Sequence, residues 1–415
     1  MRLLEELKWR GLIKDCTDFD ALCERLENPI TLYCGFDPTA ESLHIGHLQQ
    51  IILLRRYERA GHKIIALCGG ATAMIGDPRP TSERKLLTLE DVKRNVKCIK
   101  EQLNNFIDFN NENTILANNY DWLSEFDLLT FLRDYGKHFN ISYMISKDTI
   151  ASRLSKGISF TEFTYTILQA IDWLTLYNNY NCELQIGGSD QWGNIISGSD
   201  LIHKMHGSDK KLYGVTSSLI TKSDGTKFGK SEGENIWLDQ GRTSAYDFYQ
   251  FWININDNDI IPLLKRLSLK SPAEIIELEE TVKNEPHLRL AQKSLAEEMT
   301  EYVHGKDGVI KAKKITETLF SGNILDLSIE ELEQGLAGSI KFNTDNNILL
   351  IDVLVNAEIA KSKREARELI QAGSIQVNGV KQMSLDTLIL KDDAFDQRFI
   401  IIKKGKRKYF VGYFS

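Results

Sequence analysis

Residues 31–48, TLYCGFDPTAESLHIGHL, contain the transition that decides the fold. An apolar run typical of a buried strand leads into Gly35 and Pro38, and a helical pattern begins near Ser42. Further strand-like runs, KIIALCGG (63–70) and CELQIGG (182–188), alternate with long helical patterns. This alternation predicts α/β units on a parallel sheet, in which ligands bind beyond the carboxyl ends of the strands.

The chain changes character twice after this region. Residues 237–322 carry helical patterns with little strand signal, and residues 323–345 show weak periodicity and many turn residues. A helix capped by Ser362 and a hairpin signal at Asn378-Gly379 follow. We therefore expect an α/β domain over 1–236, an α-helical domain over 237–322, a linker over 323–345 and a small α+β domain over 346–415.

Composition narrows the class of protein. Six scattered cysteines form no C-x-x-C pair, which favours free thiols in a reducing compartment. No apolar run is long enough for a membrane span and the first residues lack a secretory signal pattern, so we expect a cytoplasmic protein. His203 and His206 share a helical spacing, but no further ligand lies nearby in the sequence, and we expect no metal site.

Charge is distributed unevenly along the chain. The net charge is −7, yet residues 346–415 hold 12 Lys and Arg against 8 Asp and Glu, so this part is +4 and the remainder is −11. Lys361, Lys363, Arg364 and Arg367 cluster at the start of one predicted helix. Such a cluster is often only a solvated face, but it also suits an RNA backbone.

The stretch from Thr39 to His47 combines groups that suit an anion. A helix that begins near Ser42 directs its unpaired N–H groups and the positive end of its dipole at whatever lies in front of it. His44 and His47 fall on one face, and Gly46 leaves room for a flat ring against the backbone. These parts fit a nucleotide phosphate better than a metal, which would need i,i+4 histidines and an acidic partner. An ordinary capped helix is the alternative, and this motif alone does not exclude it.

A second stretch, SDGTKFGKSEGEN (223–235), places Lys227 and Lys230 among three glycines. Such a loop can bring two ammonium groups to a phosphate chain, although a glycine- and lysine-rich turn is usually only a solvated loop. Its significance comes from its pairing with the first stretch.

The two stretches together resemble the HIGH and KMSKS signatures of the class I aminoacyl-tRNA synthetases. PTAESLHIGH and KFGKS carry the signatures, and the surrounding motifs resemble the tyrosyl-tRNA synthetases of bacterial type: GGATAMIGDP, NNYDW, FTYTILQAID, QIGGSDQWGNI and AKSKREARELIQAGSIQVNG. The resemblance covers nearly the whole chain. It implies a Rossmann-type catalytic domain, an α-helical domain and a C-terminal S4-like RNA-binding domain.

The reaction implied by this resemblance has two steps. Tyrosine and ATP form tyrosyl-adenylate and pyrophosphate, and the tyrosyl group then passes to the 3′ end of its tRNA. Thr39 and His44 would meet the γ-phosphate, and Lys227, Lys230 and Ser231 would close over the pyrophosphate. Mg²⁺ would accompany ATP. The implied ATP-binding set comprises Cys34, Gly35, Asp37, Gly46, His47, Gly188, Asp190 and Lys230.

The resemblance also implies a tyrosine site. Tyr33 and Asp172 would meet the substrate phenol, and Asp77, Tyr165 and Gln169 would receive its ammonium group. Weaker candidates are Asn119 on the phenol side and Gln191 near the carboxyl group. Tyr165, Gln169 and Asp172 recur at i, i+4 and i+7, on one face of a predicted helix. A core tyrosine with two interior polar residues is the plainer reading of that helix.

The sequence departs from the family pattern in the loop DPRPTSERK (77–85), which lacks the lysine that many members carry shortly after the Asp-Pro pair; Arg79 or Arg84 is a candidate substitute. Lys361, Lys363, Arg364 and Arg367 would bind tRNA, and a homodimer is expected. Two alternatives remain open: a tryptophanyl-tRNA synthetase, and an RNA-binding protein on a synthetase scaffold. The intact His44/Gly46/His47 and Lys227/Lys230 motifs argue against the second alternative.

Overall fold

The computed structural model describes residues 1–78, 86–154, 157–221, 223, 228–231, 234–321, 323–405 and 408–414, without the side chains of 148, 149, 152, 230, 231, 234 and 321. The chain separates into two compact units. Unit 1 comprises residues 1–243 and 253–303, and unit 2 comprises residues 244–252 and 304–415. The domain boundaries expected from the sequence stay predictions.

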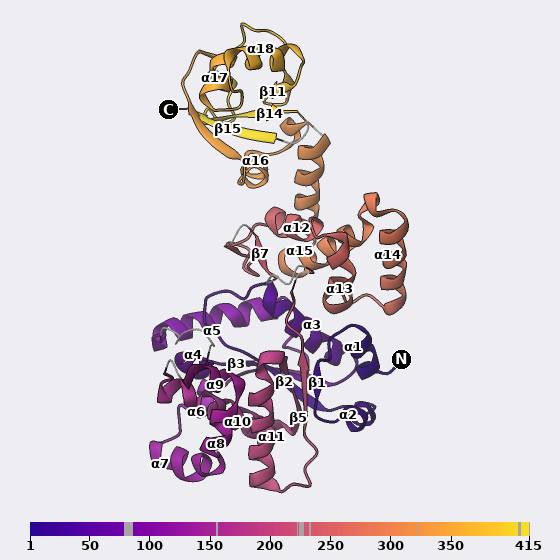
Figure 1. Ribbon diagram of the computed structural model, residues 1–415, viewed down its shortest axis with the longest axis vertical. Helices are drawn as coiled ribbons and strands as arrows, with labels where there is room; N and C mark the ends of the chain where they lie inside the picture. Colours follow the sequence, from indigo (N-terminus) through magenta and orange to yellow (C-terminus); the bar gives the residue numbers. More distant parts are fainter. Residues whose placement is uncertain are drawn as a thin grey trace. The chain divides into compact units, whose positions relative to one another are not determined.

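A six-stranded sheet in the order β1-β6-β5-β2-β3-β4 forms the centre of unit 1 (Figure 1). Neighbouring strands run parallel, except that β1 is antiparallel to β6. The predicted parallel α/β sheet is therefore confirmed. The strands are β1 (Asp15–Cys16), β2 (Thr31–Phe36), β3 (Lys63–Cys68), β4 (Thr114–Asn118), β5 (Cys182–Gly188) and β6 (Tyr213–Ser217).

Helices cover both faces of this sheet. In Figure 1, α3 (Ile45–Arg59) and α5 (Leu89–Asn104) lie on one side, and α10 (Phe160–Tyr180) and α11 (Trp192–His206) lie on the other. Helix α10 is apolar over most of its length, and Trp173 and Ile171 are fully buried in a core shared with β2 and β3. A helix that is apolar nearly all round must be buried on most sides.

Other elements complete unit 1. They are α1 (Leu3–Trp9), α2 (Phe19–Arg25), α4 (Thr72–Ile75), α6 (Tyr120–Leu123), α7 (Leu128–Thr130), α8 (Ile141–Ser146), α9 (Asp148–Leu154), β7 (Lys230–Ser231), β8 (Glu234–Asn235), α13 (Asp257–Leu267) and α14 (Pro272–Asn284). Two further helices, α12 (Ala245–Ile253) and α15 (Leu290–Ser321), run across the division of the chain.

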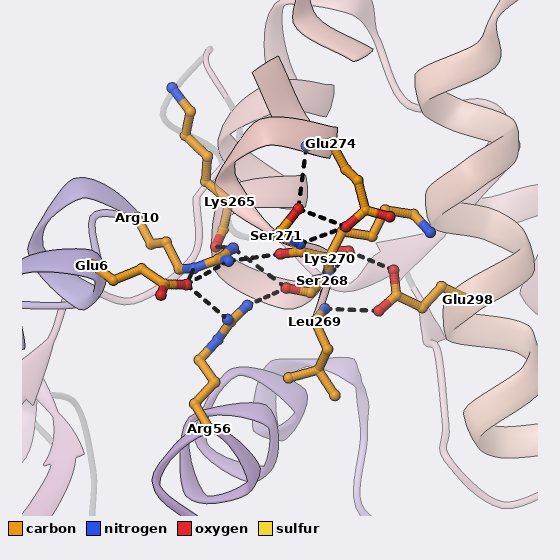
Figure 2. Close-up of polar contacts among 10 residues, drawn as sticks. All are labelled: Glu6, Arg10, Arg56, Lys265, Ser268, Leu269, Lys270, Ser271, Glu274 and Glu298. Carbon is orange, nitrogen blue, oxygen red and sulfur yellow. Dashed lines mark hydrogen bonds and ion pairs between the residues drawn. The ribbon is translucent and has the colours of Figure 1, made fainter. Parts of the chain in front are cut away.

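Two buried arginines donate hydrogen bonds to the end of α13 and the turn that follows it (Figure 2). Arg10 follows α1, and Arg56 belongs to α3. Arg10 donates to the carbonyl of Lys270 over 2.7 Å and to that of Lys265 over 3.1 Å, and Arg56 donates to the carbonyl of Ser268. Glu298 accepts the Leu269 amide over 2.7 Å from the other side. The carbonyls at the end of a helix lack intrahelical partners and carry partial negative charge, so guanidinium groups stabilise this end of α13.

Unit 2 contains a five-stranded sheet in the order β12-β11-β14-β15-β9. Helices α17 (Leu350–Asn356) and α18 (Lys363–Gln371) pack on its core. The strands are β9 (Ile340–Thr344), β11 (Ile375–Val377), β12 (Val380–Lys381), β14 (Phe399–Lys404) and β15 (Lys408–Phe414); β10 (Ile348–Leu349) and β13 (Leu388–Ile389) form a separate pair.

Local predictions for unit 2 are confirmed with one difference. Ser362 caps α18 by accepting the Glu365 amide, and the Asn378-Gly379 turn has φ angles of 48° and 82° between paired strands β11 and β12. The expected linker, however, contains regular structure: α16 (Ile329–Gly335) and β9, which pairs in parallel with β15. Its sequence looked irregular because β9 is an edge strand with mostly exposed side chains.

Candidate functional site

A cavity of about 820 Å³ opens in unit 1 where the strand order reverses between β2 and β5. Connections leave this point in opposite directions across the sheet, so the carboxyl ends of the two strands diverge and leave a crevice. The cavity is lined by the following predicted residues: Tyr33, Cys34, Gly35, Asp37, Thr39, His44, Gly46, His47, Asp77, Asn119, Tyr165, Gln169, Asp172, Gly188, Asp190 and Gln191. The fold thus brings together side chains that lie up to 158 residues apart.

The buried part of the cavity surrounds the carboxylate of Asp172, which is 2% exposed. Asn119 donates to one carboxylate oxygen over 3.0 Å, and the indole of Trp122 donates to the other over 2.9 Å. Burial raises the pKa of Asp172 to about 8, and the two hydrogen bonds oppose that rise. The nearby Tyr33 hydroxyl is buried and has no hydrogen-bond partner among the described residues, which leaves it available to a ligand.

A second acidic group sits beside this pocket. Asp77 accepts from Gln191 over 2.8 Å and from Asn194 over 3.5 Å, and burial raises its pKa to about 6. Asp37 accepts from the hydroxyls of Tyr165 and Thr72, each over 2.8 Å. Burial, reinforced by the Asp37 charge, raises the pKa of Tyr165 and keeps that hydroxyl a donor. A carboxylate such as Asp77, whose charge is costly to bury, suits a cationic ligand.

Helix α10 presents the predicted face to the cavity. Tyr165, Gln169 and Asp172 all line it, as their i, i+4, i+7 spacing indicated. The side-chain oxygen of Gln169 is buried without a partner in the described part of the chain. Tyr165 and Asp172, by contrast, form hydrogen bonds with other side chains, so of this helical face Gln169 keeps bonding capacity among the described residues.

The helix after β2 begins three residues later than predicted, at Ile45 rather than near Ser42. The reason is that Ser42 is buried and donates to the Leu43 carbonyl, while His44 takes the N-cap position. The Gly46 amide donates to Nδ1 of His44 and the His44 amide donates to Nδ1 of His47, each over 3.1 Å. Since both Nδ1 atoms accept, each neutral ring carries its proton on Nε2.

The sequence predicted that Gly46 leaves room for the flat ring of a ligand, whereas the ring that lies against Gly46 in the structure is that of His44. A Cβ atom on Gly46 would lie 2.7 Å from Cε1 of that ring, closer than real contacts allow. The glycine therefore sets the position of the histidine ring at the start of α3.

The predicted lysine loop is described only in part. Lys227 lies outside the described residues, as do Arg79 and Arg84, and only the backbone of Lys230 and Ser231 is described, in β7. The loop's far end is held against the start of α3, because the Ile45 amide donates to the Ile236 carbonyl over 3.0 Å and the Leu238 amide to the Leu43 carbonyl over 2.8 Å.

The remaining predicted residues of the cavity lie at the ends of β2 and β5. Burial raises the pKa of the Cys34 thiol to about 12, so it stays neutral. Asp190 accepts from Gln191 over 3.0 Å, and a Cβ on Gly188 would lie 2.5 Å from its carboxylate. Gly188 thus allows the carboxylate to approach the backbone of β5.

Several cavity residues were not predicted from the sequence: Gln49, Gln50, Thr72 and Gln185, together with Trp122, which reaches Asp172. Gln185 pairs in register with Tyr33 of β2, and partners in register point to the same face, but the sequence alone does not show this pairing. Trp122 lies in a four-residue helix, and the direction of its indole depends on distant packing.

The basic residues predicted to bind RNA, namely Lys361, Lys363, Arg364 and Arg367, are exposed at the beginning of α18 in unit 2. Lys363 pairs with Asp352 over 2.6 Å and Arg364 with Glu368 over 3.0 Å. These exposed pairs are weakly held and leave the cluster open to another anion.

Neither a candidate metal centre nor a candidate membrane-spanning helix occurs among the described residues. They contain no group of three His, Cys, Asp or Glu side chains arranged to hold a metal ion. Nor do they contain a helix with the length and apolar content that crossing a bilayer requires.

The chain resembles known proteins over nearly its whole length. Residues 24–321 match the family of class I tRNA synthetases (W and Y), and residues 330–412 match the tyrosine–tRNA ligase SYY-like C-terminal domain. Tyrosine–tRNA ligase 1 of Bacillus cereus is 50% identical over 417 residues, 99% of each chain, and tyrosine–tRNA ligase of Staphylococcus haemolyticus is 50% identical over 414 residues, 99% of this chain and 98% of that one. A C-terminally truncated mitochondrial tyrosyl-tRNA synthetase of Aspergillus nidulans is 32% identical, with a TM-score of 0.69 over 77% of this chain and 94% of that chain.

Proposed function

We propose, from the premise that this chain belongs to the tyrosine–tRNA ligases of the class I tRNA synthetases, that the cavity of unit 1 holds tyrosine and ATP side by side. The activity is the joining of tyrosine to tRNA: tyrosine reacts with ATP to give tyrosyl-adenylate and pyrophosphate, and the tyrosyl group then moves to the tRNA.

The observation that carries the assignment of the pocket is the pair formed by Asp172 and Tyr33. A buried carboxylate and a buried hydroxyl that has no hydrogen-bond partner among the described residues lie at the interior of a cavity whose outer end is the start of α3. A substrate phenol can donate to the carboxylate and accept from the hydroxyl. Phenylalanine can do neither and would leave both groups buried without a partner, so the pocket should reject it.

The ammonium group of the substrate suits the neighbouring acidic groups. The side-chain oxygens beside the phenol pocket belong to Asp77, Tyr165 and Gln169. Gln191 orients the Asp77 carboxylate by donating a hydrogen bond to it over 2.8 Å. An ammonium ion there would offset the cost of burying the Asp77 carboxylate. The substrate carboxyl group would then face the outer end of the cavity.

We assign the outer end to ATP. Thr39 and the Nε2–H groups of His44 and His47 lie at the N-terminus of α3, where phosphate oxygens are favoured. Asp190 suits a ribose hydroxyl, and Gly35, where an added Cβ would meet nothing within 4 Å, leaves the backbone of β2 open to the nucleotide. Gly46 and Gly188 contribute by making room for the His44 ring and the Asp190 carboxylate. Asp37 and Cys34 complete this lining.

Adenylate formation needs neither a protein nucleophile nor a strong general base, because the tyrosine carboxylate itself attacks the α-phosphate. The chain contributes positioning and stabilisation of charge that develops on the phosphates. We assign the pyrophosphate to Lys227, Lys230 and Ser231, along with His44 and Thr39. The described residues offer no cage for Mg²⁺, so we assign any Mg²⁺ to the phosphates and water and derive no step through it.

Three further assignments extend the proposal. The exposed cations of α18 would bind the tRNA backbone. A homodimer would cover exposed apolar side chains of unit 1, among them Leu128, Leu129, Ile141 and Phe160, each of which is 64–75% exposed. The protein would work in the cytoplasm, where its tRNA and ATP are found.

The deciding experiment is ATP–pyrophosphate exchange with tyrosine, tryptophan or phenylalanine, without tRNA. Exchange with tyrosine alone is expected. Exchange with tryptophan would overturn the phenol pocket while keeping the class, and a folded protein without any exchange would favour an RNA-binding role.

A further inference from the structure

Lys147, which does not line the cavity, donates hydrogen bonds to the first turns of α11. Side chains from the start of that helix bond to Asp77. Lys147 follows α8, and its ammonium group donates to the Gly193 carbonyl over 2.8 Å and to the Ser197 hydroxyl over 2.6 Å. Its methylene groups pass close to Gly193, where an added Cβ would lie 3.5 Å from Cδ. Both acceptors belong to the first turns of α11, so one side chain ties α8 to the start of α11.

That start of α11 carries the polar groups around Asp77. Gln191 and Asn194 donate to the Asp77 carboxylate over 2.8 and 3.5 Å, and Asn194 also accepts from the Thr166 hydroxyl of α10 over 2.8 Å. Gly193 and Ser197, the two partners of Lys147, lie immediately beside and one turn after these residues. A shift of this turn would therefore move both amides relative to Asp77.

We propose that Lys147 is a positioning residue for tyrosine binding, which holds the first turn of α11 so that Gln191 and Asn194 present Asp77 to the substrate ammonium group. This inference rests on the proposed role of Asp77. Lys147 itself touches neither substrate, because it is absent from the residues that line the cavity.

The electrostatic surroundings support a positioning role. Burial lowers the pKa of Lys147 to about 8, while the carboxylates of Asp200 and Asp77 favour its charged form. Tyr143 places its ring 5.7 Å from the ammonium group on the other side. A lysine that is costly to bury and forms two short hydrogen bonds has a well-defined position, which a solvated lysine would lack.

The chain offers a matched control on the same helix. Lys204, near the end of α11, donates to the His138 carbonyl over 2.7 Å but is exposed and remote in sequence from Gln191 and Asn194. Lys204→Met removes the same chemical group and the same kind of bond. Any effect common to both substitutions reflects the general loss of a lysine contact.

The test compares wild type with Lys147→Met, Lys147→Arg, Ser197→Ala and Lys204→Met. Equilibrium dialysis gives the Kd of tyrosine, pre-steady-state kinetics give the rate constant and the ATP dependence of adenylate formation, and thermal unfolding shows whether each variant is folded. For Lys147→Met we expect the Kd of tyrosine to rise about tenfold, as for loss of a charge-assisted hydrogen bond, with the saturated rate constant and ATP dependence changed less than about twofold. Arginine should restore part of the affinity, and Ser197→Ala should show a smaller rise.

Several results would overturn the inference. An unchanged Kd in folded Lys147→Met would do so, as would an equal rise in Lys204→Met or a loss confined to the rate constant. If Lys147→Met does not fold, Ser197→Ala decides alone, and an unchanged Kd there counts against the proposal. Failure of the wild type itself to bind tyrosine would refute the proposed function and, with it, this inference. If the wild type binds tyrosine and Lys147→Met binds it equally well, only the inference about Lys147 is refuted.

Discussion

The backbone amide of His44 donates a hydrogen bond to Nδ1 of His47 over 3.1 Å, so the position of the first histidine fixes the ring of the second. His44 in turn accepts from the Gly46 amide at its own Nδ1. Three positions of the motif therefore form one arrangement, in which both Nδ1 atoms accept and the ring proton of each histidine is on Nε2. A phosphate bound at this helix start would meet groups that are already oriented.

Gly46→Ala should disrupt this arrangement. The added methyl group would lie 2.7 Å from the His44 ring and force it away, and misplacement of a phosphate ligand by about 1 Å costs roughly a hundredfold in rate. We expect adenylate formation to slow by about that factor, with tyrosine affinity unchanged. Gly338→Ala, where an added Cβ meets nothing within 4 Å, is the control for a glycine substitution. Normal adenylate formation in Gly46→Ala would contradict the role of the His44 ring.

Tyr33→Phe should weaken the discrimination between tyrosine and phenylalanine without lowering the free energy of unfolding. Removing a buried hydroxyl without a partner should leave the free energy of unfolding unchanged or raise it, while discrimination between tyrosine and phenylalanine falls about tenfold. The ratio of the two pyrophosphate-exchange efficiencies measures this. Tyr57→Phe is a matched control, because that hydroxyl on α3 is equally buried and unpartnered but does not line the cavity. Equal loss of discrimination in both variants would refute the phenol assignment.

Tyrosine affinity should depend on the ionisation of Asp77. Its pKa in the folded protein is about 6, raised first by burial and then by the charges of Asp37 and Asp190. Below that pH the carboxyl group is neutral and cannot pair with the ammonium group, so affinity should rise as the pH increases from about 5 to 7. Equilibrium dialysis across this range should show the rise in wild type and in the surface variant Asp209→Asn. A similar rise in Asp77→Asn would assign the titration to another group.

Phe160→Glu should split the proposed dimer. The side chain is 72% exposed, and a charge at a buried apolar contact would have to be desolvated without a partner. Size-exclusion chromatography with light scattering should give twice the chain mass for wild type and the chain mass for the variant at micromolar concentration. Ile310→Glu, a substitution at a 65% exposed apolar residue of unit 2, should stay dimeric. A wild type that is monomeric would remove this proposal.

Arg367→Glu should impair tRNA charging while sparing adenylate formation. Its replacement places a negative charge in the cationic cluster of α18, so the KM for tRNA should rise about tenfold, with a weaker dependence of binding on salt. Lys306→Glu makes the same charge change at an exposed position of α15 and should have little effect. Equal loss of adenylate formation and charging in Arg367→Glu would argue for a general structural defect.

The sequence was most informative where function requires a local pattern. The strand at 31–36 and the helical face of Tyr165, Gln169 and Asp172 follow from periodicity, and the structure confirms both. The start of α3 was misplaced because Ser42 is engaged elsewhere: its hydroxyl lies 3.3 Å from the side-chain oxygen of Gln102, on another helix. Whether a serine caps a helix depends on which groups compete for its hydroxyl, and a local sequence pattern does not include a competing group 60 residues away.

The sequence analysis missed some site residues for the same reason, because their roles depend on partners distant in the sequence. Trp122 does not line the cavity but donates to Asp172, 50 residues later, because its short helix directs the indole at that carboxylate. Gln185 follows the alternation of β5, but which side of that strand faces a ligand depends on its pairing with β2. Both cases depend on tertiary placement, which propensity does not encode.

The hydrogen bonds from Arg10 to the end of α13 and the turn after it have a consequence for folding during synthesis. The Arg10 guanidinium and the Ser268 carbonyl are 258 residues apart, and the edge strand β1 pairs with residues 215 and 216. At roughly 10 residues per second, the first segment would leave the ribosome about 25 s before its last partner. Strands β2, β3 and β4 can assemble meanwhile, so the beginning of the polypeptide docks only after residues 265–270 have been synthesised. Nascent chains interrupted before residue 268 should expose the two N-terminal helices to protease.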